Sequence, residues 1–272
     1  MNSPPTTCPA CGLCCTRIED FSVTLGQSAI VEHINLHIHC GELTALIGPN
    51  GAGKTTLIKC IAGIHQKWNG TIRINGKPVH QYKSRELATL QSYVPQAEGR
   101  TFPLSVEEFV AMGRYPYQSA FSPLSADDHR AIDAALEQAG LVNLRARSMD
   151  TLSGGERQMA FIAAALAQET QILLLDEPST FLDYRHQANV AALLNRACRE
   201  QGKTVVAVHH DINTALSASH RILALKNGAT AFLGTPEEIV QGRTLEEIYE
   251  TAFVRSPSPE RALPLIYAGG AL

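Results

Sequence analysis

The sequence predicts an α/β fold built on a mixed β-sheet. Three short, continuously apolar runs, at residues 43–47, 171–175 and 204–208, have helical patterns nearby and are typical of strands buried on both faces of a parallel sheet. Apolar and polar residues alternate over residues 17–39 and 71–75, as in half-buried antiparallel strands. We therefore expect a sheet core with an antiparallel β edge.

Helical patterns fill residues 104–168 and predict a helical subdomain inserted between two halves of the sheet. Ser105 with Glu108, and Ser125 with Asp128, have the spacing of a capping box at a helix start.

Two further helix starts are predicted near the end of the chain. Thr235 precedes Glu238, and Thr244 precedes Glu247, again with the spacing of a capping box. Beyond Arg255 the sequence Ser-Pro-Ser-Pro predicts irregular chain.

The composition is that of an ordinary globular protein, with 272 residues, 44% of them apolar and 18% charged. A net charge of −3 argues against nucleic acid as the main partner. The longest apolar stretch, residues 159–167, is shorter than the roughly 18 residues that cross a bilayer, and no signal peptide is recognisable at Met1. We expect a chain that neither spans a membrane nor is exported.

The first chemical motif follows the strand expected at residues 43–47. Residues 48–55 match G-x-x-x-x-G-K-[ST], in which backbone N–H groups curl around phosphate oxygens. Lys54 would neutralise the β- and γ-phosphates of ATP, and Thr55 would offer its hydroxyl to Mg²⁺. The expected nucleotide-binding residues here are Gly48, Pro49, Asn50, Gly51, Ala52, Gly53, Lys54, Thr55 and Thr56.

A pair of carboxylates ends the apolar run at residues 171–175. Acidic residues at the carboxyl end of a parallel strand lie where ligands bind. We expect Asp176 to hold Mg²⁺ and Glu177 to act as the general base that polarises an attacking water.

A second anion-binding helix start is predicted at residues 152–158, Leu-Ser-Gly-Gly-Glu-Arg-Gln. One chain then carries two half-sites for phosphate, which predicts a head-to-tail pair of chains with ATP between them. The alternative is that Ser153 merely caps a helix. The expected nucleotide-binding residues of this motif are Ser153, Gly154, Gly155 and Gln158.

In this order, the motifs resemble the nucleotide-binding subunit of an ATP-binding cassette (ABC) transporter, over about residues 17–240. The resemblance implies a P-loop NTPase of ABC type. It also implies roles for three more residues, of which Gln96 contacts Mg²⁺ and follows the permease, Asp183 belongs to the D-loop, and His210 senses the γ-phosphate. His209 is adjacent to His210 and is open to confusion with it.

Three stretches, at residues 112–116, 121–127 and 180–187, resemble the ATPases of importers for iron–siderophore complexes, haem and cobalamin. This implies ATP hydrolysis coupled to uptake through a separate multi-span permease dimer, with a substrate-binding protein as an indirect partner. It also implies a peripheral position on the cytoplasmic face of the inner membrane. Two alternatives stay open, a zinc or manganese importer ATPase and a soluble ABC ATPase of iron–sulfur cluster assembly.

The chain departs from the family pattern at the adenine platform, where Leu25 stands in place of the usual aromatic residue. A leucine lacks the stacking energy of an aromatic ring, about 1 kcal/mol or more. Phe21 would replace that ring only in a different register.

The resemblance divides the chain into a Cys-rich leader at 1–16, an ABC ATPase domain at 17–240 with a helical subdomain at about 97–165, and a helical or irregular tail at 241–272. The leader contains four of the seven cysteines and is outside the family pattern. Two interpretations stay open: a Zn²⁺ or iron–sulfur site, with a further ligand from elsewhere, or a thiol-bearing leader without metal. The four leader cysteines are Cys8, Cys11, Cys14 and Cys15, and the candidate further ligands are His33, His37, His39 and Cys40.

Overall fold

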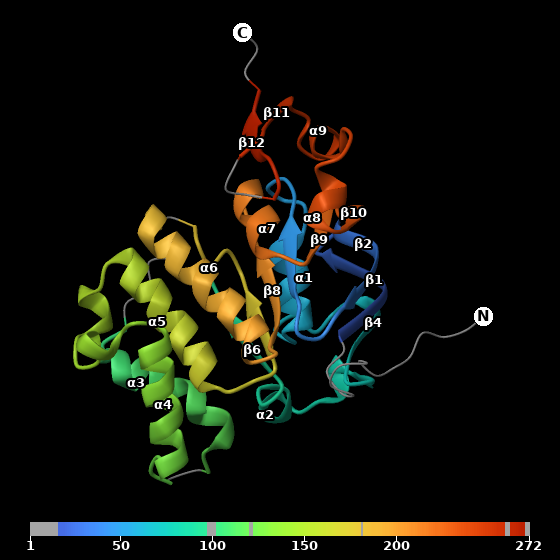
Figure 1. Ribbon diagram of the computed structural model, residues 1–272. Helices are drawn as coiled ribbons and strands as arrows, with labels where there is room; N and C mark the ends of the chain where they lie inside the picture. The colour runs from blue at the N-terminus through green and yellow to red at the C-terminus, as the bar shows by residue number, and fades with distance from the viewer. Residues whose placement is uncertain (1–15, 97–101, 120–121, 181, 259–261, 270–272) are drawn as a thin grey trace. The chain divides into compact units, whose positions relative to one another are not determined.

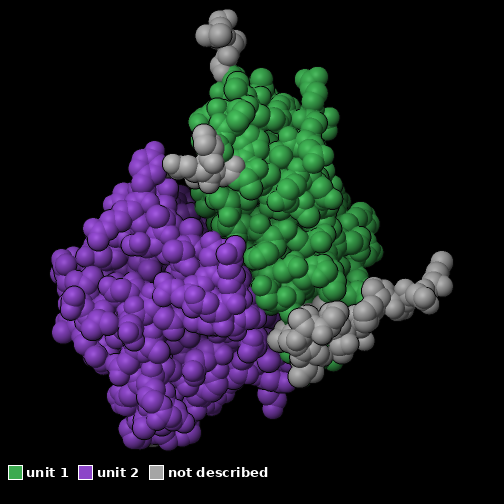
Figure 2. All heavy atoms as spheres, in the orientation of Figure 1, with its two compact units in different colours: residues 1–81, 204–272 green, residues 82–203 purple. Residues whose placement is uncertain are grey.

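The computed structural model describes residues 16–96, 102–119, 122–180, 182–258 and 262–269 (Figure 1). The chain forms two compact units (Figure 2). Unit 1 comes from two separate stretches, Met1–Gln81 and Thr204–Leu272, and unit 2 is the stretch between them, Tyr82–Lys203.

Unit 1 contains the parallel strands that the sequence predicts. Strand β3 (Leu43–Ile47) pairs in parallel with β8 (Thr204–Val208) and with β9 (Arg221–Lys226), and β10 (Ala229–Gly234) runs antiparallel to β9. Every residue of β3 and β8 is buried. The prediction of a mixed sheet is therefore confirmed.

A four-stranded antiparallel sheet, in the order β2-β1-β4-β5, forms the expected β edge of unit 1. Its strands are β1 (Thr16–Leu25), β2 (Ser28–Ile38), β4 (Asn69–Ile74) and β5 (Lys77–Pro78). Alternate side chains of β1 are buried, which explains the alternating sequence pattern.

The helices of unit 1 are α1 (Lys54–Ile61), η1 (Val79–Gln81), α7 (Ile212–Ala218), α8 (Pro236–Ile239) and α9 (Thr244–Tyr249). The chain then forms an antiparallel pair, β11 (Phe253–Ser256) and β12 (Leu265–Ala268). Leu245 and Ile248 of α9 and Ile266 of β12 lie in the same buried cluster as Ile47 of β3. The last segment of the chain thus packs on the core of unit 1.

Unit 2 contains the parallel pair β6 (Gln91–Val94) and β7 (Ile172–Leu175), and it is otherwise helical. Its helices are α2 (Ser84–Leu87), α3 (Val106–Ala111), η2 (Met112–Tyr117), α4 (Ala126–Gln138), η3 (Val142–Leu144), η4 (Met149–Thr151), α5 (Gly154–Ala167) and α6 (Tyr184–Arg199). Because unit 2 interrupts unit 1 in the sequence, it is an inserted, largely helical body.

Three of the four predicted capping boxes are present, at Ser105, Ser125 and Thr235. The fourth prediction is wrong, because Thr244 is already the first residue of α9. Arg243 occupies the N-cap position, and its side chain makes no capping hydrogen bond.

Across the described ranges, no helix combines the length and the apolar character that crossing a membrane requires.

Candidate nucleotide-binding site

The phosphate-binding loop predicted at residues 48–55 joins β3 to α1 in unit 1. Gly51 and Gly53 have φ angles of 79° and 95°, a region that side chains disfavour. A Cβ on Gly53 would lie 2.4 Å from Val31 Cγ2, and one on Gly48 would lie 2.0 Å from the carbonyl oxygen of Leu225. Conformation therefore favours glycine at positions 51 and 53, and close packing requires it at positions 48 and 53.

Lys54 curls back over this loop and is only 5% exposed. Its Nζ donates hydrogen bonds to the carbonyl oxygens of Gly48 at 2.8 Å and Pro49 at 2.9 Å. The loop thus carries a buried cation at the start of a helix, which suits a phosphate. Side-chain oxygens suited to Mg²⁺ belong to Thr55 in this loop and to Asp176 in unit 2.

The predicted carboxylate pair lies at the end of β7 in unit 2. Asp176 is 3% exposed and accepts a hydrogen bond from the Tyr93 hydroxyl at 3.2 Å. Glu177 has a φ of 54°, and its Oε2 accepts from Gln96 Nε2 at 3.0 Å and from Thr180 Oγ1 at 3.2 Å. Unit 2 therefore brings three predicted residues together.

Sequence reasoning missed two members of this group, Tyr93 and Thr180. Tyr93 lies on β6, three residues before Gln96 in the sequence. Thr180 lies three residues after Glu177. β6 is the parallel neighbour of β7, with Tyr93 opposite Leu174. The short spacing of Tyr93 from Gln96 and of Thr180 from Glu177 was the available signal in the sequence.

Ser153 is the N-cap of α5 and forms a full capping box with Glu156. Its Oγ accepts from the Glu156 backbone N–H at 3.3 Å and donates to Glu156 Oε2 at 2.8 Å. The capping role is therefore real, and it leaves Ser153 exposed at the helix start. Gly155 and Gln158 are buried on the inner side of the same helix, where a Cβ on Gly155 would lie 2.4 Å from the His186 ring.

Asp183 caps α6 in unit 2. Its Oδ1 accepts from the His186 backbone N–H at 2.8 Å and lies 2.8 Å from His186 Nδ1. These contacts with His186 lower the pKa of the Asp183 carboxyl. Asp183 thus satisfies a backbone N–H in the first turn of α6.

The adjacent residues His209 and His210, which follow β8 in unit 1, differ in burial. His209 is 4% exposed, and burial lowers its pKa to about 4. Within the described part of the chain, neither of its ring nitrogens has a hydrogen-bond partner. His210 is exposed. The exposed residue is thus the one expected to meet a nucleotide.

At the expected adenine platform, β1 presents Leu25 in place of an aromatic ring. Leu25 is 47% exposed at the end of β1. Phe21 is fully buried, with its ring 6.3 Å from that of Trp68. Since Phe21 belongs to the core, it does not replace the missing platform ring.

The four leader cysteines lie outside the described residues, so their chemistry stays a prediction. Within the described residues no group of three or more metal-ligating side chains is present. His37 and His39 lie 4.6 Å apart between ring centroids. Burial is the largest cause that lowers the pKa of His37, and the neighbouring His39 adds to it.

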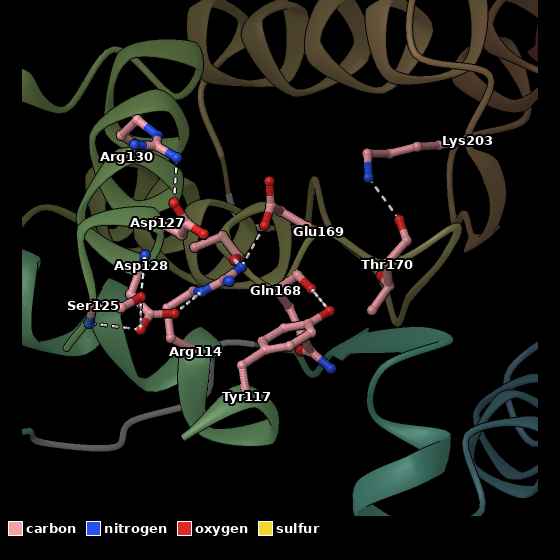
Figure 3. A network of polar contacts seen from close by, with 11 residues as sticks. Arg114, Tyr117, Ser125, Asp127, Asp128, Arg130, Gln168, Glu169, Thr170 and Lys203 are labelled. Carbon is pink, nitrogen blue, oxygen red and sulfur yellow. Dashed lines mark hydrogen bonds and ion pairs between the residues drawn. The ribbon is translucent and has the colours of Figure 1, made fainter. Parts of the chain in front are cut away.

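The stretch at residues 112–116 has a structural role in unit 2 (Figure 3). Buried Arg114 donates to Asp128 Oδ1 at 2.8 Å, to the Ala167 carbonyl at 2.6 Å and to Glu169 Oε2 at 2.7 Å. The Arg114 guanidinium also lies 4.2 Å from the centre of the Tyr117 ring. Hydrogen bonds from Arg114 and then Ser125 lower the pKa of Asp128 to about 2. This stretch ties η2 to α4 and to the end of α5.

Comparison with known proteins agrees with this geometry. The sequence profile of the family described as "ABC transporter" matches residues 31–180. The chain is 39% identical over 251 residues to the iron(3+)-hydroxamate import ATP-binding protein FhuC of Bacillus subtilis (strain 168), covering 92% of this chain and 93% of that protein. It is 37% identical over 250 residues to the ferric enterobactin transport ATP-binding protein FepC of Escherichia coli (strain K12), covering 92% of each.

Among solved structures, an inward-facing metal-chelate type ABC transporter matches with a TM-score of 0.82 and 26% identity, covering 94% of this chain and 98% of that one. The matched profile covers more than half of the chain, and the two curated relatives match nearly their full length. The chain is therefore a member of the ABC transporter family.

Proposed function

We propose that this chain is the ATP-hydrolysing subunit of an ABC importer and that its cargo is an iron chelate, either a siderophore complex or haem. The observation that carries the ATPase part is the buried Lys54 ammonium, held at 2.8 Å from Gly48 O inside a glycine-lined loop at the start of α1. The cargo part rests on relatives named for import of iron(3+)-hydroxamate, ferric enterobactin and hemin.

In this proposal, the phosphate-binding loop at residues 48–55 holds the phosphates. Thr55 and Asp176 hold Mg²⁺, which supplies positive charge to the phosphate oxygens when bound. Glu177 takes a proton from the attacking water. Gln96 would contact Mg²⁺ and respond to the permease, Asp183 would act as the D-loop residue, and His210 would sense the γ-phosphate. Ser153 of a second copy, with the start of its α5, covers the γ-phosphate from the other side.

Two copies would thus form a head-to-tail dimer with two ATP molecules between them. The dimer would act on a pair of permease subunits from the cytoplasmic face of the inner membrane, and a separate binding protein would deliver the cargo. A solved cassette from a bacterial ABC transporter, 27% identical to this chain, is a dimer. Its likeness supports a dimer here.

Transport by a reconstituted complex tests this proposal. The tagged full-length chain is purified from its native membranes with the permease that accompanies it, and the complex is placed in vesicles with a binding protein. Uptake of radioactive iron as a hydroxamate complex and as haem is compared with uptake of cobalamin, Zn²⁺ and Mn²⁺. We expect ATP-dependent uptake of an iron chelate, lost in Lys54→Ala.

ATP-dependent uptake of Zn²⁺ or Mn²⁺ alone would contradict the iron-chelate assignment while leaving the ATPase role intact. Recovery of a cluster-assembly scaffold and no permease would contradict the importer role itself. Full ATP turnover by Lys54→Ala would contradict the nucleotide site.

A further inference from the structure

Tyr249, in the segment that follows the parallel sheet, contacts the phosphate-binding loop. Tyr249, the last residue of α9, accepts a hydrogen bond from the Gly48 backbone N–H through its hydroxyl at 3.0 Å. The two residues are 201 positions apart in the sequence. Burial raises the pKa of Tyr249 to about 12, so its hydroxyl stays neutral at physiological pH.

Gly48 links this tyrosine to Lys54. The N–H of Gly48 is held by Tyr249, and its carbonyl oxygen accepts from Lys54 Nζ at 2.8 Å. Its backbone lies close against β9, since a Cβ on Gly48 would lie 2.0 Å from the Leu225 carbonyl oxygen. The backbone N–H and carbonyl of Gly48 are thus both hydrogen-bonded, the N–H to Tyr249 of α9 and the carbonyl oxygen to the Lys54 ammonium.

The Tyr249 hydroxyl is itself held in place, because α9 contacts the rest of unit 1 at several points. Lys226 of β9 donates from Nζ to the Glu247 carbonyl at 2.5 Å and pairs with Glu250 at 2.8 Å. The Tyr249 ring packs edge-on against Phe253, with centroids 5.9 Å apart. A side chain fixed on both its ring and its hydroxyl is suited to position a neighbouring backbone.

We propose that Tyr249 is a positioning residue for the phosphate-binding loop, and that the segment beyond residue 240 thereby sets the affinity for Mg-ATP. The inference rests on the proposed role of residues 48–55 in holding phosphate. Without the hydroxyl, the Gly48 N–H loses its acceptor, and the junction between β3 and the loop is free to shift away from the geometry that Lys54 requires.

The test compares binding of a non-hydrolysable ATP analogue with Mg²⁺ in the full-length chain by calorimetry. Tyr249→Phe removes only the hydroxyl and keeps the ring packed. We expect its dissociation constant to rise about tenfold, the change expected for a backbone N–H left without an acceptor. The KM for ATP should rise in parallel, while kcat at saturating ATP stays within about twofold.

Two control variants separate positioning from packing. Phe253→Leu weakens the packing around the same ring and keeps the hydroxyl, so it should lower the melting temperature and leave the dissociation constant within about twofold. Tyr267→Phe removes the hydroxyl of a β12 side chain that is 50% exposed, and it should change neither quantity.

A dissociation constant within twofold of wild type in Tyr249→Phe would overturn the inference, and so would an equal rise in Phe253→Leu. Lys54→Ala is measured alongside, because it tests the phosphate site itself. Loss of binding in Lys54→Ala together with normal binding in Tyr249→Phe would reject only the role of Tyr249. Normal binding in Lys54→Ala would reject the site on which it rests.

Discussion

Gln96 Nε2 donates a hydrogen bond to Glu177 Oε2 at 3.0 Å. The residue expected to respond to the permease is thus in direct contact with the carboxylate expected to activate water. Thr180 Oγ1 donates to the same oxygen at 3.2 Å. On the proposed roles of these residues, a displacement of Gln96 would change what holds the Glu177 carboxylate, and this would be a short physical route from a permease to catalysis.

Glu177→Gln should bind Mg-ATP normally and lose ATP turnover by roughly 10²-fold or more, because an amide does not accept the proton of water. The variant should accumulate as an ATP-bound dimer, measured by gel filtration with light scattering. Thr180→Val is the control, since it removes one donor to the same carboxylate and no charge, and its turnover should fall by less than about threefold. Near wild-type hydrolysis by Glu177→Gln would end its assignment as the base.

Mixing two inactive variants tests whether sites are shared between chains. Lys54→Ala disables the phosphate loop of its own chain, and Ser153→Arg disables the site on the other chain. A one-to-one mixture should regain at most about one quarter of wild-type activity, because half of the dimers are mixed and each has one intact site. Mixing Ser153→Arg with the double variant should regain none. Full activity of either variant alone would refute shared sites.

The buried pair of Arg114 and Asp128 should control the stability of unit 2. Asp128→Asn removes the buried charged partner of the Arg114 guanidinium and leaves it with Glu169, whose side chain is 60% exposed. We expect a loss of about 3 kcal/mol in the free energy of unfolding at neutral pH. Asp127→Asn is the matched control, because Asp127 and its partner Arg130 are both about three-quarters exposed. Urea unfolding followed by circular dichroism measures both, and equal effects would contradict the special role of the buried pair.

Local features of the fold were predictable from the sequence. Strands β3 and β8 begin and end where their apolar runs do, because both faces of each strand are buried. Capping boxes involve residues three positions apart, so the boxes at Ser105 and Ser125 were predictable from the local sequence alone. Thr244 had the same spacing and failed, because Arg243 already holds the N-cap position.

Contacts between distant residues were not predictable from spacing. The phosphate-binding loop is a local motif, whereas the hydrogen bond from Gly48 to Tyr249 spans 201 residues. The burial of Gly155 against His186 likewise depends on how α5 and α6 pack. Sequence patterns therefore identified the residues that bear the chemistry, and packing supplied those that hold them in position.

Metal binding by the leader stays a prediction, because Cys8, Cys11, Cys14 and Cys15 lie outside the described residues. If they bind metal, anaerobically purified protein should carry near-stoichiometric zinc or iron, lost when residues 1–16 are deleted. ATP binding should survive that deletion, because every expected phosphate contact lies after Gly41. Elemental analysis decides, and equal metal in the deleted form would leave a leader without a metal site.

His209 should make the stability of unit 1 sensitive to mild acid. Burial lowers its pKa from 6.5 to about 4, while the charge of Asp211 acts in the opposite direction. Between these two pH values the unfolded chain binds a proton at this position that the folded chain does not, so stability falls as pH drops from about 6.5 to 4. His209→Leu removes this titration and should flatten the pH dependence of the melting temperature in that window. An unaltered slope in His209→Leu would show that other groups cause the loss of stability in acid.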